Sequence, residues 1–276
     1  MDILNILKEA CNQVYDQART MIGTERGNEK VGRGAGGDIS RRIDIVAEEA
    51  VMEIIKKHDF HPTVIAEESG RIEGKDQGFL VIDAIDGTTN TSRAIPFCCC
   101  SLAYALDFKL SSVIHGAVLD LSRGDLYYAS NQQGAFMNNT RNHVSKSLEH
   151  WNIDEGNNLD DILVGVNISG ASPQVIMSLF KVISKANHVR HFGANALELC
   201  YFARGLLDAY IDIRGKIRAT DLAAAYLVVN EAGGKLYSMD GSKLDSELGN
   251  NTKISFVAAT NDDIFAHLAA DMQIRG

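Results

Sequence analysis

The chain has 276 residues, 45% of them hydrophobic and 23% charged, a composition typical of a soluble globular protein with one large domain or two modest ones. Its formal net charge of −9 argues against nucleic acid as the main partner, because neutralising phosphates takes clustered Lys and Arg. No apolar run reaches the roughly 20 residues that cross a bilayer, and the first residues lack a signal peptide's basic start and apolar stretch, so we expect a cytoplasmic protein with no membrane partner.

The first two predicted elements are amphipathic helices separated by a glycine-rich segment that we expect to be mobile. Apolar residues recur at helical spacing over residues 3–22 and again over residues 43–54. Asp38 or Ser40 is expected to cap the second helix. Asp44 falls on the flank of its apolar stripe, and an acid that faces inward in a first helical turn needs a partner.

Strand-like runs follow the two helices. They cover residues 63–66, 79–83, 98–106, 112–121 and 125–130. Their consecutive order and short turns predict a largely antiparallel sheet backed by the helices. Polar residues crowd positions 138–161, and we place a domain boundary there, which divides the chain into an N-terminal α+β domain over 1–150 and a C-terminal α/β domain over 151–276.

Beyond the boundary the pattern alternates between strand and helix. Strands are predicted over residues 162–168, 189–192 and 209–213 and in the segments KLYS and ISFVAAT, and helices over residues 173–186, 195–204 and 221–232. This order is that of a mixed α/β domain, and the fold class of the whole chain is α+β.

Acidic residues stand where the apolar strands end. In the stretch VIDAIDGTTN, Asp83 ends a strand and Asp86 lies on the turn after it, while Glu67 and Glu68 follow an earlier strand in the same way. Carboxylates that converge on one edge are costly unless a cation compensates them, and Mg²⁺ prefers such oxygen ligands. A lone pair of acids at this spacing is more often a capping or solvated pair, so this alternative stays open.

The Gly-Thr-Thr-Asn that follows favours an anion site. Gly87 lets a backbone approach a ligand closely, and a helix that begins at Thr88 would direct free N–H groups at an anion. A second helix start, at Thr220 and Asp221, carries a further acid in its first turn. Metal-binding acids beside an anion-binding helix start are what phosphoryl transfer to water requires.

Several segments together resemble the motifs of the inositol monophosphatase superfamily of Mg²⁺-dependent, lithium-sensitive sugar phosphatases. They are AEESG, VIDAIDGTTN, GAFMNN and TDLAAAYLVVNEAGG, and they occur in the family's order over most of the chain. The resemblance implies a layered αβαβα sandwich, two or three Mg²⁺ per active site and a homodimer. It implies a particular set of metal ligands, namely Glu67, Asp83, the carbonyl of Ile85, Asp86 and Asp221.

The resemblance also implies catalytic roles. A Thr at position 88, oriented by an Asp at position 44, would help to activate the attacking water. Glu67 would act on the same water through the metal ion that it binds. Gly87 and Thr88 would supply N–H groups to the phosphate. The water would attack phosphorus in line, with no phosphoenzyme. Two departures, Thr220 for the usual Trp and Ala84 for the usual Pro, remove no ligand, whereas Gly193-Ala194-Asn195 replaces a usual Gly-Ser or Gly-Thr and leaves sugar recognition open.

A basic segment before Asp221 is the candidate for substrate choice. Arg214, Lys216 and Arg218 would share one face of a strand with Asp212, and three cations beside a metal would suit a second phosphate. Arg190 could join them. By resemblance, Asp212 would contact sugar hydroxyls and Asn195 would lie at the start of the substrate helix. The alternative is a solvated basic edge strand and a surface Arg190.

This arrangement resembles the dual-activity microbial branch, which hydrolyses both fructose 1,6-bisphosphate and inositol 1-phosphate, and that is the expected function. One alternative is a phosphatase for 3′-phosphorylated adenine nucleotides or NADP, for which the sequence shows no clear apolar platform for a base. A second alternative is a non-catalytic, metal-binding regulatory protein. The intact acids argue against it, because a retired site has no physical reason to keep them together.

Overall fold

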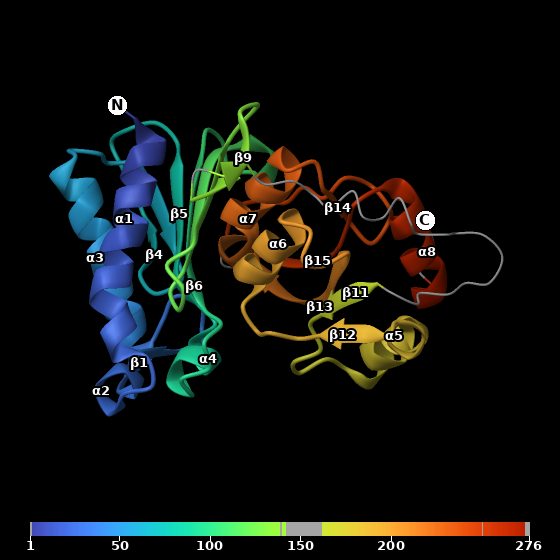
Figure 1. Cartoon of the computed structure of the whole chain (residues 1–276). Helices are drawn as coiled ribbons and strands as arrows, with labels where there is room; N and C mark the ends of the chain where they lie inside the picture. The colour runs from blue at the N-terminus through green and yellow to red at the C-terminus, as the bar shows by residue number, and fades with distance from the viewer. Residues whose placement is uncertain (1, 139, 142–161, 250, 274–276) are drawn as a thin grey trace.

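The computed structural model describes residues 2–138, 140–141, 162–249 and 251–273. Two main sheets stand side by side, joined by helices between them (Figure 1). The predicted domain boundary between residues 150 and 151 falls outside the described residues, so the division into 1–150 and 151–276 stays a prediction. Within the described ranges, no helix is both long enough and apolar enough to cross a membrane.

The first sheet has eight strands in the order β10-β9-β8-β7-β6-β5-β3-β4. Its strands are β3 Thr63–Ala66, β4 Gly70–Ile72, β5 Phe79–Asp86, β6 Cys99–Ala105, β7 Val113–Asp120, β8 Leu126–Ser130, β9 Gly134–Met137 and β10 Thr140–Arg141. The predicted antiparallel arrangement is confirmed for every neighbouring pair except β3 and β5, which run parallel. Because β3 and β5 run in the same direction, their carboxyl ends meet at one edge of the sheet.

The second sheet has five strands in the order β12-β11-β13-β15-β14. Its strands are β11 Leu163–Val166, β12 His188–Arg190, β13 Ala209–Arg218, β14 Lys235–Tyr237 and β15 Lys253–Ala259. The strands β12, β11 and β13 are parallel, whereas β13, β15 and β14 are antiparallel, so the predicted mixed sheet is confirmed.

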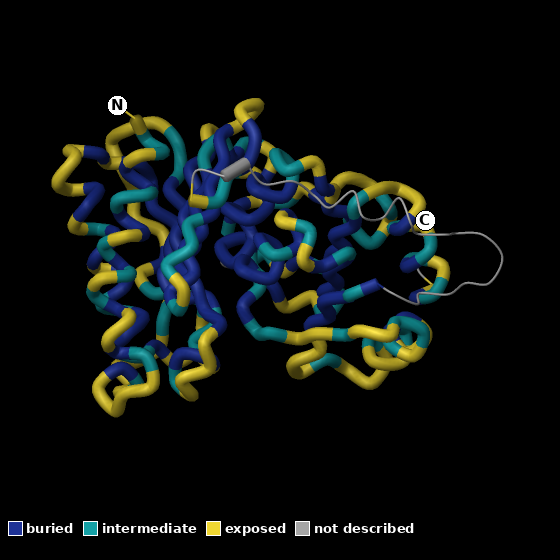
Figure 2. Tube along the Cα trace, viewed as in Figure 1, coloured by how far each residue is buried: buried dark blue, intermediate teal, exposed yellow. Residues whose placement is uncertain are grey.

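The longer helices form the remaining layers. They are α1 Ile3–Ala18, α3 Arg42–Lys57, α5 Pro173–Lys185, α6 Asn195–Ala203, α7 Ala219–Glu231 and α8 Asp262–Met272. The helices α1 and α3 cover the outer face of the first sheet, α6 and α7 lie between the sheets, and α5 and α8 cover the outer face of the second. This confirms the predicted αβαβα sandwich, and Figure 2 shows the buried chain concentrated in the sheets and the central helices.

Short elements complete the described structure. They are the 3-10 helices η1 Arg19–Met21 and η2 Leu110–Ser112, the helices α2 Glu25–Asn28 and α4 Thr88–Ser92, and the strands β1 Lys30–Arg33 and β2 Ile39–Arg41. The strands β1 and β2 form a hairpin whose glycine-rich turn was expected to be a mobile segment. The Ala35 and Gly36 N–H groups of that turn donate to the carbonyls of Glu68 and Glu67 at 2.9 Å each, which ties the turn to the end of β3.

Two helix starts differ from the prediction. Helix α3 begins at Arg42 with Arg41 as its N-cap, because residues 39–41 pair with β1, so neither Asp38 nor Ser40 caps it. Helix α7 begins at Ala219 with Arg218 as its N-cap, which places Thr220 inside the first turn. In both helices the third residue is an aspartate that accepts a hydrogen bond from the backbone of the cap.

Candidate metal and phosphate site

A cavity of about 740 Å³ opens where β3, β5, α4, α6 and α7 meet. Most of the residues singled out in the sequence line it, and these are Asp44, Glu67, Asp83, Ile85, Asp86, Gly87, Thr88, Asn195, Arg214, Arg218 and Asp221. Three do not line it, Arg190, Asp212 and Lys216. The structure therefore gathers residues that lie more than 170 positions apart in the sequence.

Parallel pairing of β3 with β5 brings the first acids together. Ala66 lies opposite Ile82, so Glu67, which follows β3, and Asp83 of β5 come side by side. The strand β5 continues to Asp86, so the predictions that Asp83 ends the strand and that Asp86 lies on the turn after it are wrong. Asp221 enters from the start of α7, and one carboxylate oxygen each from Glu67, Asp83 and Asp221 lies within 4.8 Å of the other two. All three acids are withdrawn from solvent, Asp83 most of all at 2% exposure.

The cluster has the chemistry of a hard-cation site. Asp83 Oδ1 is buried and has no hydrogen-bond partner among the described residues. Burial, and then the Glu67 carboxylate, raises the pKa of Asp83 well above its usual value, and burial raises the pKa of Glu67 to about 7. Buried carboxyls in this state bind either protons or a cation, and an all-oxygen donor set suits Mg²⁺. The residues present therefore fit the metal that the sequence predicts.

Asp86 and Ile85 stand beside that cluster with partners of their own. Asp86 Oδ2 accepts a hydrogen bond from the backbone N–H of Ala196 at 2.7 Å, which ties β5 to α6. Burial, and then Asp221, raises the pKa of Asp86 to about 8. The Ile85 carbonyl accepts a hydrogen bond from Thr88 Oγ1 at 3.3 Å. Both predicted ligands line the cavity, but neither belongs to the tight group of Glu67, Asp83 and Asp221.

The prediction that Asp44 faces inward is confirmed, since only 4% of it is exposed. Its Oδ2 accepts a hydrogen bond from the Arg41 backbone N–H at 2.8 Å, while its buried Oδ1 has no partner within the described part of the chain. Burial raises the pKa of Asp44 to about 7, and the nearby Thr88 hydroxyl acts in the opposite direction. The Asp44 carboxyl is thus poised to exchange a proton near neutral pH.

The turn between β5 and α4 depends on Gly87. Its φ of +95° is a left-handed conformation that side chains disfavour, and a Cβ there would lie 3.1 Å from the Phe97 carbonyl oxygen. Gly87 is also the N-cap of α4, so Asp86 is not. The bend lets the Gly87 and Thr88 backbone face the cavity beside the acids.

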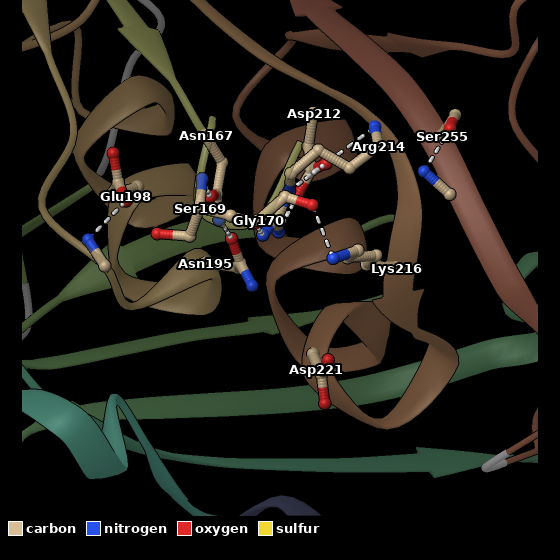
Figure 3. A network of polar contacts seen from close by, with 12 residues as sticks. Asn167, Ser169, Gly170, Asn195, Glu198, Asp212, Arg214, Lys216, Asp221 and Ser255 are labelled. Carbon is tan, nitrogen blue, oxygen red and sulfur yellow. Dashed lines mark hydrogen bonds and ion pairs between the residues drawn. The ribbon is translucent and has the colours of Figure 1, made fainter. Parts of the chain in front are cut away.

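The cations of the basic segment are held by partners within the protein. A bulge in β13 between Asp212 and Ile217, with φ of +63° at Gly215, interrupts the period of two. Arg214 folds back on Asp212, and Lys216 Nζ donates to the Gly170 carbonyl at 2.6 Å (Figure 3). Arg214 and Arg218 line the cavity and Lys216 does not, so the three cations do not form a free row facing it.

Two predicted substrate contacts are occupied elsewhere. Asp212 is fully buried, and both its oxygens accept hydrogen bonds from Arg214, whose Nη1 donates to the Ser169 carbonyl at 2.9 Å. Arg190 is exposed and donates to the Val189 carbonyl at 2.9 Å. In the described structure, neither Asp212 nor Arg190 presents its charge to the cavity, so the predicted contacts of Asp212 with sugar hydroxyls and of Arg190 with a second phosphate are not supported.

Asn195 is held in the wall of the cavity. Its Oδ1 accepts from Asn167 Nδ2 at 2.8 Å (Figure 3). The same oxygen accepts from the Tyr210 hydroxyl at 2.6 Å. These two hydrogen bonds to the amide oxygen orient the Asn195 side chain. Its Nδ2 is then the group that can contact a ligand.

Sequence reasoning missed three polar residues of this wall, Asn167, Ser169 and His191. Ser169 Oγ and His191 Nε2 are 2.8 Å apart. Asn167 directly follows β11 and His191 directly follows β12, and the carboxyl ends of parallel strands are where open α/β sheets bind ligands. This rule could have identified both positions from the predicted strands.

An apolar wall was also missed. The rings of Phe97 and Phe192 are stacked with their centroids 4.7 Å apart, and both line the cavity together with Ile95, which is 45% exposed. Phe97 precedes β6 and Phe192 precedes α6, so no local pattern pairs them.

Comparisons with known proteins agree with this geometry. A sequence model of the family described as "Inositol monophosphatase family" matches residues 2–274. A fructose-1,6-bisphosphatase/inositol-1-monophosphatase of Methanothermobacter thermautotrophicus is 33% identical, over 95% of this chain and 93% of its own length. One of Archaeoglobus fulgidus is 32% identical, over 97% and 96%.

A further relative and a solved structure are also similar to this chain. A bifunctional NADP phosphatase/NAD kinase of Methanococcus maripaludis is 30% identical over 94% of this chain, which spans about half of that relative, 47%. Among solved structures, an inositol monophosphatase-fructose 1,6 bisphosphatase superposes with a TM-score of 0.85 at 25% identity. The superposition covers 98% of this chain and 100% of that structure's chain.

Proposed function

This chain belongs to the inositol monophosphatase family, and on that premise we propose that it is a Mg²⁺-dependent phosphatase that hydrolyses phosphate monoesters of sugars and cyclitols. Fructose 1,6-bisphosphate and inositol 1-phosphate are the proposed substrates, supported by the names of the two archaeal relatives. The observation that carries the proposal is the buried group of Glu67, Asp83 and Asp221 beside the Gly87 turn.

The charge balance of the cavity supports the need for metal. Arginines at positions 41, 214 and 218 line it, against a larger set of acids, Asp38, Asp44, Glu67, Glu68, Asp83, Asp86 and Asp221. A phosphate dianion would be repelled from such a cavity unless cations were present. When bound, Mg²⁺ would supply an acidified water and polarise the phosphate.

We assign the chain's own groups to the remaining tasks. The Thr88 hydroxyl and the Asp44 carboxyl accept the proton of the attacking water, since the pKa of Asp44 is raised to about 7 by burial. The Gly87 and Thr88 N–H groups hold the phosphate oxygens. Asn195 Nδ2 contacts the substrate from the α6 side. The phosphate leaves as inorganic phosphate, with no phosphoenzyme.

The finer features of the proposal rest on family resemblance. They are occupancy by two or three Mg²⁺ ions, inhibition by lithium, assembly as a homodimer and a cytoplasmic location. Substrates are small phosphorylated molecules, and neither nucleic acid nor membrane is a proposed partner.

A second candidate substrate class is a phosphorylated adenine nucleotide, such as NADP. The stacked Phe97 and Phe192 with exposed Ile95 form an apolar wall on which a base could lie. The Methanococcus relative supports this candidate by its name.

A substrate panel tests the proposal. Phosphate release is measured side by side from fructose 1,6-bisphosphate, inositol 1-phosphate, NADP and 3′-phosphoadenosine 5′-phosphate, each with Mg²⁺ and with EDTA. We expect Mg²⁺-dependent release from both sugar phosphates. Turnover of inositol 1-phosphate without any turnover of fructose 1,6-bisphosphate would refute the dual activity, and release confined to the nucleotides would favour the second candidate.

A further inference from the structure

Arg218 lies inside the candidate metal cluster rather than beside it. Its Nη2 donates to Glu67 Oε1 at 2.6 Å, and its Nε donates to Asp221 Oδ1 at 3.1 Å. Only 11% of its side chain is exposed. Since Glu67 and Asp221 are two of the three acids whose oxygens converge within 4.8 Å, a guanidinium already bridges the ligands that a metal would use.

The same guanidinium also contacts the turn of the β1–β2 hairpin. Its Nη1 is 3.4 Å from Asp38 Oδ2. A Cβ added at Gly36 would lie 2.5 Å from Nη1, so the turn packs closely against the end of the Arg218 side chain. One cation thereby joins the end of β3, the start of α7 and the hairpin turn.

The charge of Arg218 is firmly held in this position. Burial alone would lower the pKa of Arg218, but Asp221 and Glu67 outweigh it and raise that pKa. The guanidinium is therefore always charged, and it neutralises part of the acid cluster. A metal ion that takes these Glu67 and Asp221 oxygens as ligands competes with Arg218 for them, and the metal and the guanidinium repel each other at a few ångströms in a buried site.

We propose that Arg218 is an internal counter-cation of the metal-free site, and that its ion pairs with Glu67 and Asp221 break when a divalent cation binds there. The released guanidinium stays in the cavity, where it can contact the phosphate of a substrate. Arg218 is thus a positioning residue that couples metal occupancy to anion binding. The inference rests on the metal site proposed above.

Side-chain NMR of the full chain tests the displacement directly. The Nε–Hε signal of Arg218, assigned by its loss in Arg218→Lys, is followed during a Mg²⁺ titration of metal-free protein. Arg214 supplies an internal control, since its Nε donates to Asp212 at 2.9 Å and not to a candidate ligand. Its signal is assigned in the same way with Arg214→Lys. A Mg²⁺-induced rise in Tm reports binding independently.

We expect the Arg218 signal to shift or broaden as Mg²⁺ is added, while the Arg214 signal stays in place. If Mg²⁺ raises Tm but the Arg218 signal does not change, the displacement of Arg218 is refuted. The proposal of a metal site is then unaffected. If neither Tm nor the Arg218 signal responds to Mg²⁺, the metal site itself is wrong and the inference falls with it.

Metal affinity gives a second measurement. Arg218→Met removes the ion pairs, so calorimetric titration with Mn²⁺ should show binding about tenfold tighter than in the wild type. Arg41→Met is the matched control, because Arg41 lines the same cavity and makes no ion pair with Glu67 or Asp221. An equal gain in both variants would mean that general charge, and not displacement, governs the affinity.

Discussion

Ala66 lies opposite Ile82 in a parallel pair of strands within an otherwise antiparallel sheet. Glu67 directly follows β3 and Asp83 is the next residue of β5, so the pairing brings both acids to one edge. Asp221 completes the group from the start of α7. The candidate metal site is thus a consequence of strand direction and of one helix start, rather than of any contiguous motif.

The stability of an Asp83→Asn variant tests the metal-ligand role without an activity assay. In EDTA we expect its free energy of unfolding to match or exceed that of the wild type, by up to about 2 kcal/mol, because a buried carboxyl without a partner becomes neutral. Mg²⁺ should raise the Tm of the wild type but not of the variant, by thermal unfolding. An equal Mg²⁺ shift in both proteins would remove Asp83 from the ligand set.

The Arg214–Asp212 pair is expected to stabilise the fold rather than bind phosphate. Both groups are withdrawn from solvent, with side-chain exposures of 9% and 0%. We predict that Arg214→Gln and Asp212→Asn each destabilise the protein in urea unfolding, and that the double variant shows a coupling of about 1 to 3 kcal/mol. Additive effects would show that the two side chains act independently.

The apolar wall should matter for nucleotides alone. Phe192→Leu removes one of the two stacked rings, so kcat/KM for NADP should fall about tenfold while kcat/KM for inositol 1-phosphate changes little. Phe265→Leu is the control, because Phe265 stacks on Tyr237 at 4.1 Å and does not line the cavity. A loss of the same size on both substrates would point to general damage to the site.

Glu198 should make stability depend on pH. It is fully buried in α6, its Oε1 accepts from the Gly193 N–H at 2.9 Å, and its Oε2 has no partner in the ranges that the structure describes. Burial raises the pKa of Glu198 from 4.5 to about 7. Since the folded state holds this proton more tightly, the stabilisation is present at low pH and is lost as pH rises through about 7.

Comparison with Glu198→Gln isolates that contribution. The free energy of unfolding of the wild type minus that of the variant should fall by on the order of 3 kcal/mol between about pH 5 and about pH 9. Other buried acids titrate in both proteins and cancel in the difference. A difference that stays constant across this range would show that Glu198 does not titrate near neutral pH.

Much of the site could be predicted because its signals are local. The acids that follow apolar runs, the Gly87 turn and the inward Asp44 each follow from a few neighbouring residues, and all of them line the cavity. The layered sandwich follows from helical and strand periodicity in chain order. Helix starts were less predictable, since pairing of residues 39–41 with β1 took precedence over the capping preference of Asp38 and Ser40.

Contacts between distant segments could not be predicted from local patterns. Arg214 and Lys216 of β13 donate to the carbonyls of Ser169 and Gly170, more than 40 positions earlier, and the period of a strand does not reveal such partners. Phe97 and Phe192 meet only because the first sheet and α6 pack together. The most consequential contact, between Arg218 and Glu67, joins residues that only tertiary structure brings together.

Turnover by an Asp83→Asn variant is the most direct test of the central claim, that buried acids hold a metal which hydrolyses a phosphate ester. Phosphate release from inositol 1-phosphate is measured for the wild type with Mg²⁺, the wild type after EDTA, Asp83→Asn with Mg²⁺, and Asp16→Asn, whose exposed acid on α1 serves as control. We predict release by the wild type and by Asp16→Asn with Mg²⁺ and at least about a thousandfold less in the other two samples. Near-normal release after EDTA or by Asp83→Asn would contradict the account.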